Sequence, residues 1–295
     1  MNLENPLIMY FIFSPYALYF VGFFSLIISS FLNVVIIRLP IMIIKQSTIA
    51  AKTHLHIDLN EEDMKPFNLM FPASHCIQCK QKVKWYHNIP IFSYLFLQGQ
   101  CAYCHQRYAI RYILIECLYP LCSIILFYYF QQSPLLFIGY WLFFTALFIL
   151  FFIDIDHMLL PDEITLSFIW IGLLFNILSH ETVLIHAILG AIIGYVFLWL
   201  VYQIFLLITG KEGLGYGDFK LMSMIGAWLG YQAIFPIIFI SSLLGICFSL
   251  MLIARKKMDK NTPFAFGPWI IIATVIYFIF TVHLSLSFQI LPFRL

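Results

Sequence analysis

The sequence predicts an all-α membrane protein, a polytopic bundle of about eight transmembrane helices with one small polar insert. Hydrophobic residues make up 62% of the 295 residues and charged residues only 10%, against roughly 25% charged residues in an ordinary soluble domain. Long apolar runs fill most of the chain, and one polar stretch of any size extends from Arg38 to about Arg111. We therefore expect a first span at 1–37, an insert at 38–110 and a membrane-embedded domain of about seven spans at 111–295.

Eight apolar runs meet or approach the length of about 20 residues that a helix needs to cross a hydrocarbon core of about 30 Å. The fourth and sixth are short, so these spans are expected to tilt, to thin the bilayer or to form a re-entrant hairpin. The first run lacks a basic segment before it and carries Glu4, which predicts a retained span and not a cleaved signal peptide. The runs are 7–37, 112–130, 135–153, 164–178, 183–208, 219–229, 233–254 and 269–286.

The positions of the basic residues predict the topology. With eight spans and the N-terminus on the periplasmic side, every Lys and Arg except Arg294 lies on the cytoplasmic side. This one-sided placement follows the positive-inside rule. The net charge of +2 argues against nucleic-acid binding, which needs clustered basic residues on one face. The insert is therefore expected in the cytoplasm.

Four cysteines in the insert have the spacing of a structural zinc site. Cys76 and Cys79 form one CxxC turn, and Cys101 and Cys104 form a second one after 21 intervening residues. Two disulfides are the alternative, but thiols stay reduced in the cytoplasm. Four thiolates would also fill the tetrahedral coordination of zinc and leave no position for a catalytic water. The sequence therefore predicts a small cytoplasmic zinc-binding insert with a structural metal.

A polar loop is expected before these cysteines, between 43 and 71. It contains the acidic residues Asp58, Glu61, Glu62 and Asp63. A solvated charged surface explains these acids most simply. A docking site for a basic segment is the alternative.

Asp154 and Asp218 are the candidate catalytic residues, because acidic side chains beside membrane spans are costly and are candidates for a function by default. Asp154 belongs to DIDH at the end of the third predicted span, and Asp218 follows GLGYG at the start of the sixth. Two complete spans separate them, so both emerge on the cytoplasmic face and can meet. Two carboxyl groups within about 3 Å share one proton, so one can activate water while the other donates to a scissile carbonyl.

Neighbouring acids have simpler structural explanations. Asp156 lies about 200° around a helix from Asp154, so both cannot point into one cleft. Asp162 follows Pro161 and is expected to be the N-cap of the next helix. Asp218 is also a candidate for the N-cap of the sixth span, a structural role that is compatible with catalysis. Glu116 is expected to pair with an arginine near the start of the second span.

Glycines at 213, 215 and 217 precede Asp218. Because glycine has no Cβ, these residues are expected to let an extended peptide approach the backbone closely. A phosphate-binding loop is disfavoured, since no GK[ST] sequence follows and no strand precedes.

These motifs together resemble the type IV prepilin peptidase family, which combines leader peptidase and N-methyltransferase activities in the bacterial inner membrane. The resemblance covers nearly the whole chain. In that family the first Asp of DxDHxxLPD and the Asp of GxGD are catalytic, which implies this role for Asp154 and Asp218. The matching stretches are SFLNVVIIRLP at 30–40, PASHCIQC at 72–79, WYHNIPIFSYLFLQGQCAYC at 85–104, RYILIE at 111–116, DIDHMLLPD at 154–162, GLGYGDFKLM at 213–222 and FGP at 266–268.

The resemblance implies that the chain cuts a short basic leader from type IV prepilins or type II secretion pseudopilins. It also implies methylation of the new N-terminal amine with S-adenosylmethionine as the donor. The complete set of four cysteines is similar to that of the bifunctional members. No glycine-rich fingerprint for S-adenosylmethionine is visible, so methyl transfer rests on the resemblance alone and its residues are not assigned.

Two other functions compete with this one. A presenilin-like GxGD intramembrane protease without methyltransferase activity would share the motif at Asp218 but would not explain the four cysteines. A membrane transporter could use Asp154 and Asp218 as a proton or cation relay. The placement of both acids on one face argues against a relay, which needs carboxylates distributed through the depth of the membrane.

Overall fold

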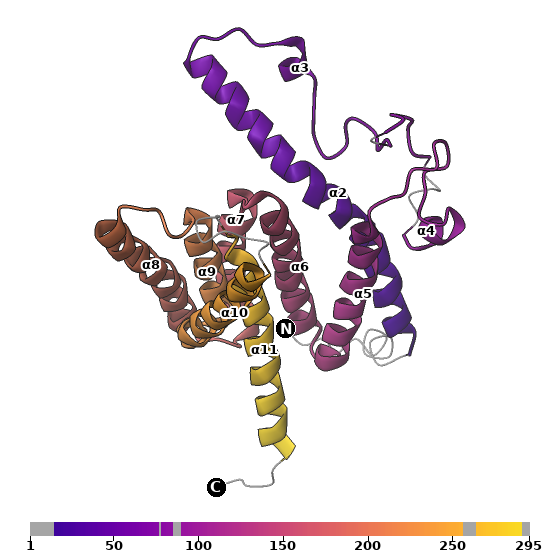
Figure 1. Cartoon of the computed structure of the whole chain (residues 1–295). Coiled ribbons are helices and arrows are strands. Elements are labelled where there is room, and N and C mark those ends of the chain that lie inside the picture. Colours follow the sequence, from indigo (N-terminus) through magenta and orange to yellow (C-terminus); the bar gives the residue numbers. More distant parts are fainter. Residues whose placement is uncertain (1–14, 77, 85–89, 256–263, 291–295) are drawn as a thin grey trace. The chain divides into compact units, whose positions relative to one another are not determined.

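The structure is a computed structural model that describes residues 15–76, 78–84, 90–255 and 264–290. Its regular elements in these ranges are helices, with two isolated β-bridges and no longer strand, so the predicted all-α class is confirmed (Figure 1). The chain divides into two compact units, Met1–Phe144 and Thr145–Leu295.

Each predicted span corresponds to one helix, although residues 7–14 of the first lie outside the described residues. Two short helices and a 3-10 turn lie between the spans, namely α3 (Glu61–Met64), α4 (Phe92–Phe96) and η2 (Tyr231–Ala233). The eight long elements are α2 (Pro15–His54), α5 (Ile110–Phe130), α6 (Pro134–His157), α7 (Asp162–Ser179), α8 (Leu184–Thr209), α9 (Tyr216–Leu229), α10 (Ile234–Ala254) and α11 (Gly267–Ile290).

Six helical segments are long and apolar enough to cross a membrane. Five are α2, α5, α6, α7 and α8, and the sixth joins η2 to α10. The fourth predicted span, α7, reaches 18 residues. By contrast α9 has 14 residues and a length of about 21 Å, less than the thickness of about 30 Å that a span must cross. The sixth predicted span is therefore a helix too short to cross the membrane by itself.

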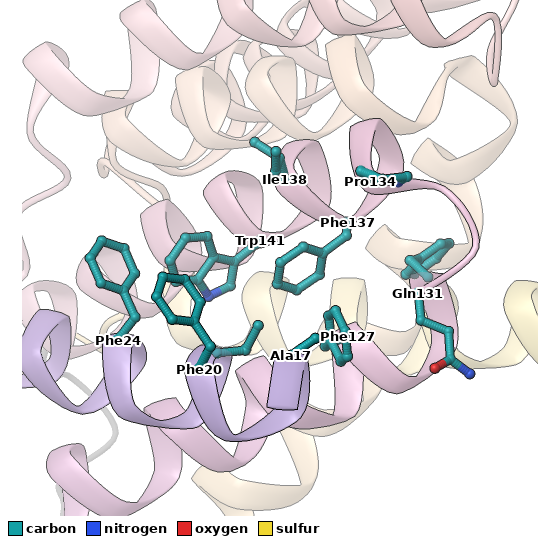
Figure 2. A pocket seen from close by; sticks show the side chains of 11 residues that line it. Ala17, Phe20, Phe24, Phe127, Gln131, Pro134, Phe137, Ile138 and Trp141 are labelled. Atoms are coloured by element: carbon teal, nitrogen blue, oxygen red, sulfur yellow. The ribbon is translucent and has the colours of Figure 1, made fainter. Parts of the chain in front are cut away.

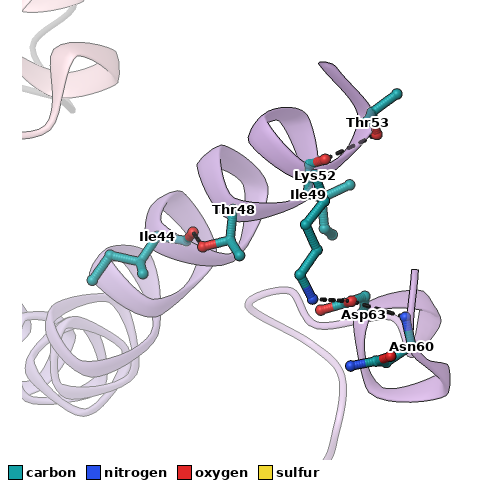
Figure 3. A network of polar contacts seen from close by, with 7 residues as sticks. All are labelled: Ile44, Thr48, Ile49, Lys52, Thr53, Asn60 and Asp63. Carbon is teal, nitrogen blue, oxygen red and sulfur yellow. Dashed lines mark hydrogen bonds and ion pairs between the residues drawn. The ribbon is translucent and has the colours of Figure 1, made fainter. Parts of the chain in front are cut away.

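The first helix continues much further than its apolar run. α2 extends to His54, so the expectation of a loop from residue 43 onward is wrong for its first twelve residues. Thr48 donates a hydrogen bond to the carbonyl of Ile44, and Thr53 donates to that of Ile49 (Figure 3). Ser47 also donates to the carbonyl of Ile44, so these polar side chains are satisfied on the helix itself. The helical extension is therefore polar, and hydropathy does not detect it.

Ion pairs and hydrogen bonds tie this extension to the segment 60–72. Lys52 Nζ lies 2.6 Å from Asp63 Oδ2, and the same carboxylate accepts the backbone N–H of Asn60 (Figure 3). The Lys52 ammonium lowers the pKa of Asp63. Lys45 Nζ donates to the carbonyl of Lys65 at 2.7 Å. Asp63 therefore contacts a basic residue of its own chain.

Arg38 makes the most extensive of these contacts. Its guanidinium donates to the backbone carbonyls of Asn68, Leu69 and Pro72, at 3.0, 3.2 and 2.6 Å. It also lies over the ring of Phe67, 5.9 Å from the centroid. The planar guanidinium presents several N–H donors in a fixed fork, which suits a set of converging carbonyls. Arg38 thus fixes the chain just before the first cysteine turn.

An aromatic cavity of about 260 Å³ lies within the unit Met1–Phe144, between α2, α5 and the first turns of α6 (Figure 2). The rings of Phe137 and Trp141 stack with centroids 5.8 Å apart. No ionisable side chain lines the cavity, so it offers no acid or base. Its lining comprises Ala17, Phe20, Val21, Phe24, Phe127, Phe130, Gln131, Pro134, Phe137, Ile138 and Trp141.

The unit Thr145–Leu295 is built around α9, which packs mainly against α8 and α7. Ten of the fourteen residues of α9 are buried. A Cβ at Gly194 of α8 would lie 2.6 Å from the carbonyl oxygen of Met222, and a Cβ at Gly226 would overlap the backbone of Gly190. Small residues let helix backbones approach closely in membranes. The glycines therefore allow a short helix to fit tightly against a long one.

The far end of α9 is fixed by polar contacts. The amide nitrogen of Asn176 donates to the carbonyls of Ala227 and Trp228, at 2.9 and 3.1 Å. The indole N–H of Trp228 donates to the carbonyl of Phe168 at 2.8 Å. Gly230 ends the helix with φ +82°, a conformation that L side chains rarely adopt. These contacts set the position of α9 along its axis.

We predict that Gly226→Ala destabilises the unit by about 1–3 kcal/mol, because the added methyl group overlaps the Gly190 backbone and forces the two helices apart. Thermal unfolding in detergent measures the effect. Gly22→Ala is the matched control, since a Cβ there meets only the side chain of Ile124 at 3.5 Å. Equal melting temperatures for the two variants would contradict the tight helix contact.

Candidate active site and candidate metal centre

Asp154 lies near the end of α6, three residues before its last residue, His157. It is only 5% exposed, and its Oδ2 atom is buried without a hydrogen-bond partner among the described residues. Asp156 is exposed. The predicted separation of these two acids on the helix is confirmed, and a buried carboxylate oxygen without a partner is a candidate for contact with a substrate or a water.

Asp218 is the third residue of α9 and is 6% exposed. Gly215, with φ −82° and ψ 146°, is the N-cap residue, and its N–H donates to Asp218 Oδ2 at 3.3 Å. The expectation that Asp218 itself is the N-cap is therefore wrong. The Asp218 carboxylate, at the third helical position, instead accepts the backbone N–H of the N-cap residue Gly215, as acids in a capping box do.

The two carboxyl groups are close enough to interact electrostatically. Leu160, from the α6–α7 loop, packs beside both acids, since Cβ atoms at Gly217 and Gly267 would lie 2.9 Å and 3.3 Å from its side chain. A Cβ at Gly267 would also overlap Asp154 Oδ2. Four segments therefore close around the acids. The prediction that Asp154 and Asp218 meet agrees with this arrangement, and their catalytic role stays a prediction.

The contributions of Leu160 and Gly267 were not predicted. Both lie in quoted motifs, DIDHMLLPD and FGP, but the sequence does not indicate that these two motifs contact each other. Only the packing of the loop against α9 and α11 reveals it.

The three glycines before Asp218 have different roles. A Cβ at Gly213 would lie 2.6 Å from the ring of Phe205, and one at Gly217 would press on Leu160. Only Gly215 has open space beside it, since the nearest atom to its Cβ position is Asp218 Oδ2 at 3.6 Å. The expectation that all three admit a substrate is wrong for Gly213 and Gly217, whose missing side chains make room for the protein itself.

Asp162 ties two helices together at the same end of the unit. Lys220 Nζ lies 2.7 Å from both of its carboxylate oxygens. Pro161 is the N-cap of α7 and Asp162 the first helical residue, so the N-cap prediction for Asp162 is wrong. The sequence does not indicate which acid Lys220 binds. In the fold, Lys220 of α9 binds Asp162 of α7.

Two mutually interacting, buried carboxyl groups can perform acid and base chemistry together. Ionising both at once is unfavourable, so one proton is shared between them. The ionised group can accept a proton from water, and the protonated group can donate one to a carbonyl.

The four insert cysteines converge. Their sulfur atoms all lie within 4.8 Å of one another, and the Cys76–Cys104 and Cys79–Cys101 pairs are 3.7 and 3.9 Å apart. A tetrahedral zinc with Zn–S distances of about 2.3 Å requires sulfur separations of about 3.8 Å. The cluster can therefore hold one metal ion. No histidine belongs to this group in the described part of the insert.

The two cysteine turns have the same construction. The N–H of Cys76 donates to Gln81 O, and that of Cys101 donates to Gln106 O, at 3.0 and 2.8 Å. Backbone N–H groups of Cys79 and Gln78 lower the pKa of the Cys76 thiol. Those of Cys104 and Tyr103 lower the pKa of Cys101 to about 6. Thiolates are the metal-binding form, so these backbone donors favour ligation by Cys76 and Cys101. Burial and the neighbouring sulfur groups instead raise the pKa of the Cys104 thiol to about 11.

Glu116 also lies in the unit Met1–Phe144, on α5. Its Oε2 accepts the backbone N–H of Ile91 at 2.8 Å, and its Oε1 accepts Asn33 Nδ2 at 3.4 Å. The expectation that Glu116 pairs with an arginine is therefore wrong, since its hydrogen-bond partners are a backbone N–H and an amide. The carboxylate instead joins α2, α5 and the residue before α4.

Two family models cover most of the chain. The bacterial peptidase A24 N-terminal domain matches residues 23–130, and the type IV leader peptidase family matches residues 141–250. The chain belongs to the type IV leader peptidase family. No solved structure matches it.

Several curated relatives of this leader peptidase chain are named prepilin leader peptidase/N-methyltransferase. The protein of Neisseria gonorrhoeae is 41% identical over 266 residues, which cover 90% of this chain and 91% of the relative. That of Aeromonas salmonicida (strain A449) is 42% identical, covering 87% and 89%. That of Dichelobacter nodosus is 38% identical, covering 95% and 97%.

We predict that replacing any one of the four cysteines with serine lowers both the bound zinc and the protease resistance of the insert, because metal binding supplies much of the folding free energy of such small sites. Elemental analysis and limited proteolysis measure the two effects. Cys247→Ser is the control, since this exposed cysteine lies on α10 outside the cluster. Wild-type protein that contains no zinc would contradict the metal centre.

We predict that Gly267→Ala reduces peptide cleavage by at least tenfold while the unit stays folded, because its Cβ would displace the Asp154 carboxylate. Gly245→Ala is the matched control, since a Cβ there makes only ordinary contacts of 3.7–3.8 Å. Cleavage rates and melting temperatures are compared. Unchanged cleavage by Gly267→Ala would place the reacting oxygen of Asp154 elsewhere.

Proposed function

We propose that this leader peptidase cleaves the leader from type IV prepilins or type II secretion pseudopilins and then N-methylates the new terminal residue. The names of the relatives and the family model support both activities. The observation that carries the peptidase activity is the pair of buried, interacting carboxyl groups, Asp154 and Asp218.

The pair hydrolyses the peptide bond by direct attack of water. The ionised carboxylate takes a proton from the water as its oxygen bonds to the scissile carbonyl carbon, while the protonated carboxyl group donates its proton to the carbonyl oxygen. The tetrahedral species then collapses and the C–N bond breaks. The departing amine takes the proton that the first carboxylate received from water, and the second carboxylate takes back a proton from one hydroxyl group as the carbonyl re-forms. No covalent enzyme intermediate is formed.

The cysteine cluster of Cys76, Cys79, Cys101 and Cys104 would hold a structural zinc ion. Four thiolates complete its coordination, so no position remains for an activated water. A zinc ion held by these thiolates would order the insert, and the carboxylates carry the chemistry of peptide cleavage.

S-adenosylmethionine, when bound, would supply an electrophilic methyl group for the neutral amine. Cleavage precedes methylation because the amine that is methylated does not exist until the leader has been removed.

The six apolar segments support a multi-pass protein of the bacterial inner membrane. With a periplasmic N-terminus, the insert lies in the cytoplasm together with the ends of α6 and α9 that carry the acids. The leader is then presented from the cytoplasm while the apolar segment of the substrate stays in the bilayer. The bond to be cut lies at the membrane surface.

We predict that Asp154→Asn and Asp218→Asn each abolish cleavage and that the double variant is little worse than either single one, because the two acids act as one unit. Mass spectrometry of a purified prepilin incubated with each variant measures the product. Asp156→Asn is the matched control and should cleave normally. Robust cleavage by Asp154→Asn would refute the assignment.

The same variants also test the methyltransferase. Asp218→Asn should still methylate a pilin whose leader was removed beforehand, since methyl transfer needs no proton from this pair. Loss of that reaction in folded protein would mean that the two activities share the site. Membrane transport without cleavage, or cleavage of unrelated membrane helices without methylation, would favour the two competing functions.

A further inference from the structure

Glu116 carries a carboxylate that the peptidase chemistry does not use. It lies on the second turn of α5, a membrane helix, and is half-buried. Ionisable residues inside membrane helices are costly and are usually kept for a function. Its environment is built by three elements, with Asn33 from α2 and Ile91 from the turn before α4.

No cation neutralises Glu116 among the residues that the structure describes. Its two hydrogen-bond donors, the Ile91 N–H and Asn33 Nδ2, are both neutral. The other acids of the unit whose side chains are described differ from it. Asp63 pairs with Lys52, and Asp58 and Glu61 are exposed to solvent. Glu116 is therefore a half-buried carboxylate whose charge no described cation neutralises.

The geometry leaves acceptor capacity at this place. An ionised carboxylate offers about four lone-pair directions, and Glu116 uses two of them, one in a long contact of 3.4 Å. Asn33 Nδ2 also points to the carbonyl of Tyr112. Because both partners of this amide nitrogen are acceptors, the amide oxygen of Asn33 faces away from them. An ammonium group carries three N–H donors, which match the remaining oxygen lone pairs of Glu116.

We propose that Glu116, with Asn33, binds the N-terminal amine of the cleaved substrate in its protonated form. The bound ammonium then gives one proton to water, which leaves the nitrogen with the lone pair that methyl transfer needs. The inference rests on the proposed function, because methylation requires the chain to hold this amine after the leader has left. Asp154 and Asp218 are occupied with peptide hydrolysis and lie in the other unit, so a separate carboxylate serves the second reaction.

A purely structural role makes a different prediction. If Glu116 only holds Ile91, which has an unusual φ of +62° for a β-branched residue, then a neutral acceptor suffices. Glu116→Gln keeps a carbonyl oxygen for the Ile91 N–H and removes only the charge. This variant therefore separates amine binding from support of the backbone.

The test compares two peptides that carry the apolar N-terminal segment of a cleaved pilin, one with a free amine and one acetylated. Binding to the full-length protein in detergent is measured by fluorescence anisotropy. The wild type should bind the free-amine peptide about tenfold or more tightly than the acetylated one, because a charge-assisted hydrogen bond is lost on acetylation. A wild type without this preference overturns the proposal whatever any variant does.

Glu116→Gln should reduce the preference to about one, and Glu116→Asp, which retains the charge, should restore part of it. Glu61→Gln, which changes an exposed acid of the same unit, should keep the full preference. Zinc content and protease resistance report whether each variant is folded. A folded Glu116→Gln protein that still prefers the free amine overturns the role of Glu116.

Two further measurements distinguish the remaining outcomes. Binding of S-adenosylmethionine should be the same in wild type and Glu116→Gln; its loss, with the amine preference retained, would assign the carboxylate to the donor and overturn the proposal. Methyl transfer by the wild type to the free-amine peptide tests the proposed function itself. Its absence there would refute the methyltransferase, whereas normal transfer with an unchanged preference in Glu116→Gln would refute only the amine site.

Discussion

Electrostatic repulsion between two buried carboxyl groups constrains the whole unit Thr145–Leu295. Asp154 and Asp218 are each almost fully shielded, and Asp154 Oδ2 accepts no hydrogen bond among the described residues. Burying such groups costs free energy that tight packing elsewhere must offset. The rest of the unit provides that packing, since α9 is enclosed by α7 and α8 and fixed at its far end by Asn176 and Trp228.

Glycine is the residue that makes this enclosure possible. Gly217 and Gly267 let Leu160 and the backbone of α11 close around the two acids, and Gly226 lets α9 lie directly against the backbone of α8. At each of these positions, a side chain would overlap atoms of a segment that is distant in the sequence. The positive φ that glycine also permits occurs where α8 and α9 end, at Gly210 and Gly230.

The membrane helices and the cysteine cluster were predictable because their signals are local. Hydropathy over 20 residues identifies a span, and two CxxC turns identify a metal site from spacing alone. The extension of α2 to His54 was not predictable in this way. This extension is polar and is held by Arg38 and Lys52, whose partners lie in the later segment 60–72.

The sequence also did not predict which partner each charged residue binds. Glu116 was expected to meet an arginine but binds a backbone N–H, and Asp162 was expected to cap a helix but binds Lys220. Several candidate partners are equally close in sequence, and only packing decides among them. The meeting of Asp154 and Asp218 can be inferred from their shared side of the membrane, but their burial and the contacts of Leu160 beside them cannot.

The ion pair between Asp162 and Lys220 indicates how deep the acids lie. Its side chains are 53% and 26% exposed, so the pair belongs at the aqueous boundary and not within hydrocarbon. α9 begins at Tyr216, after the exposed residues Lys211 and Glu212, and runs inward to the buried Trp228. Asp218 precedes Lys220 on this helix, so its backbone lies no deeper than that of the lysine. The carboxyl pair is therefore shielded by protein while lying close to water. This position suits a hydrolase that needs water as a reactant and cuts its substrate where a membrane helix emerges.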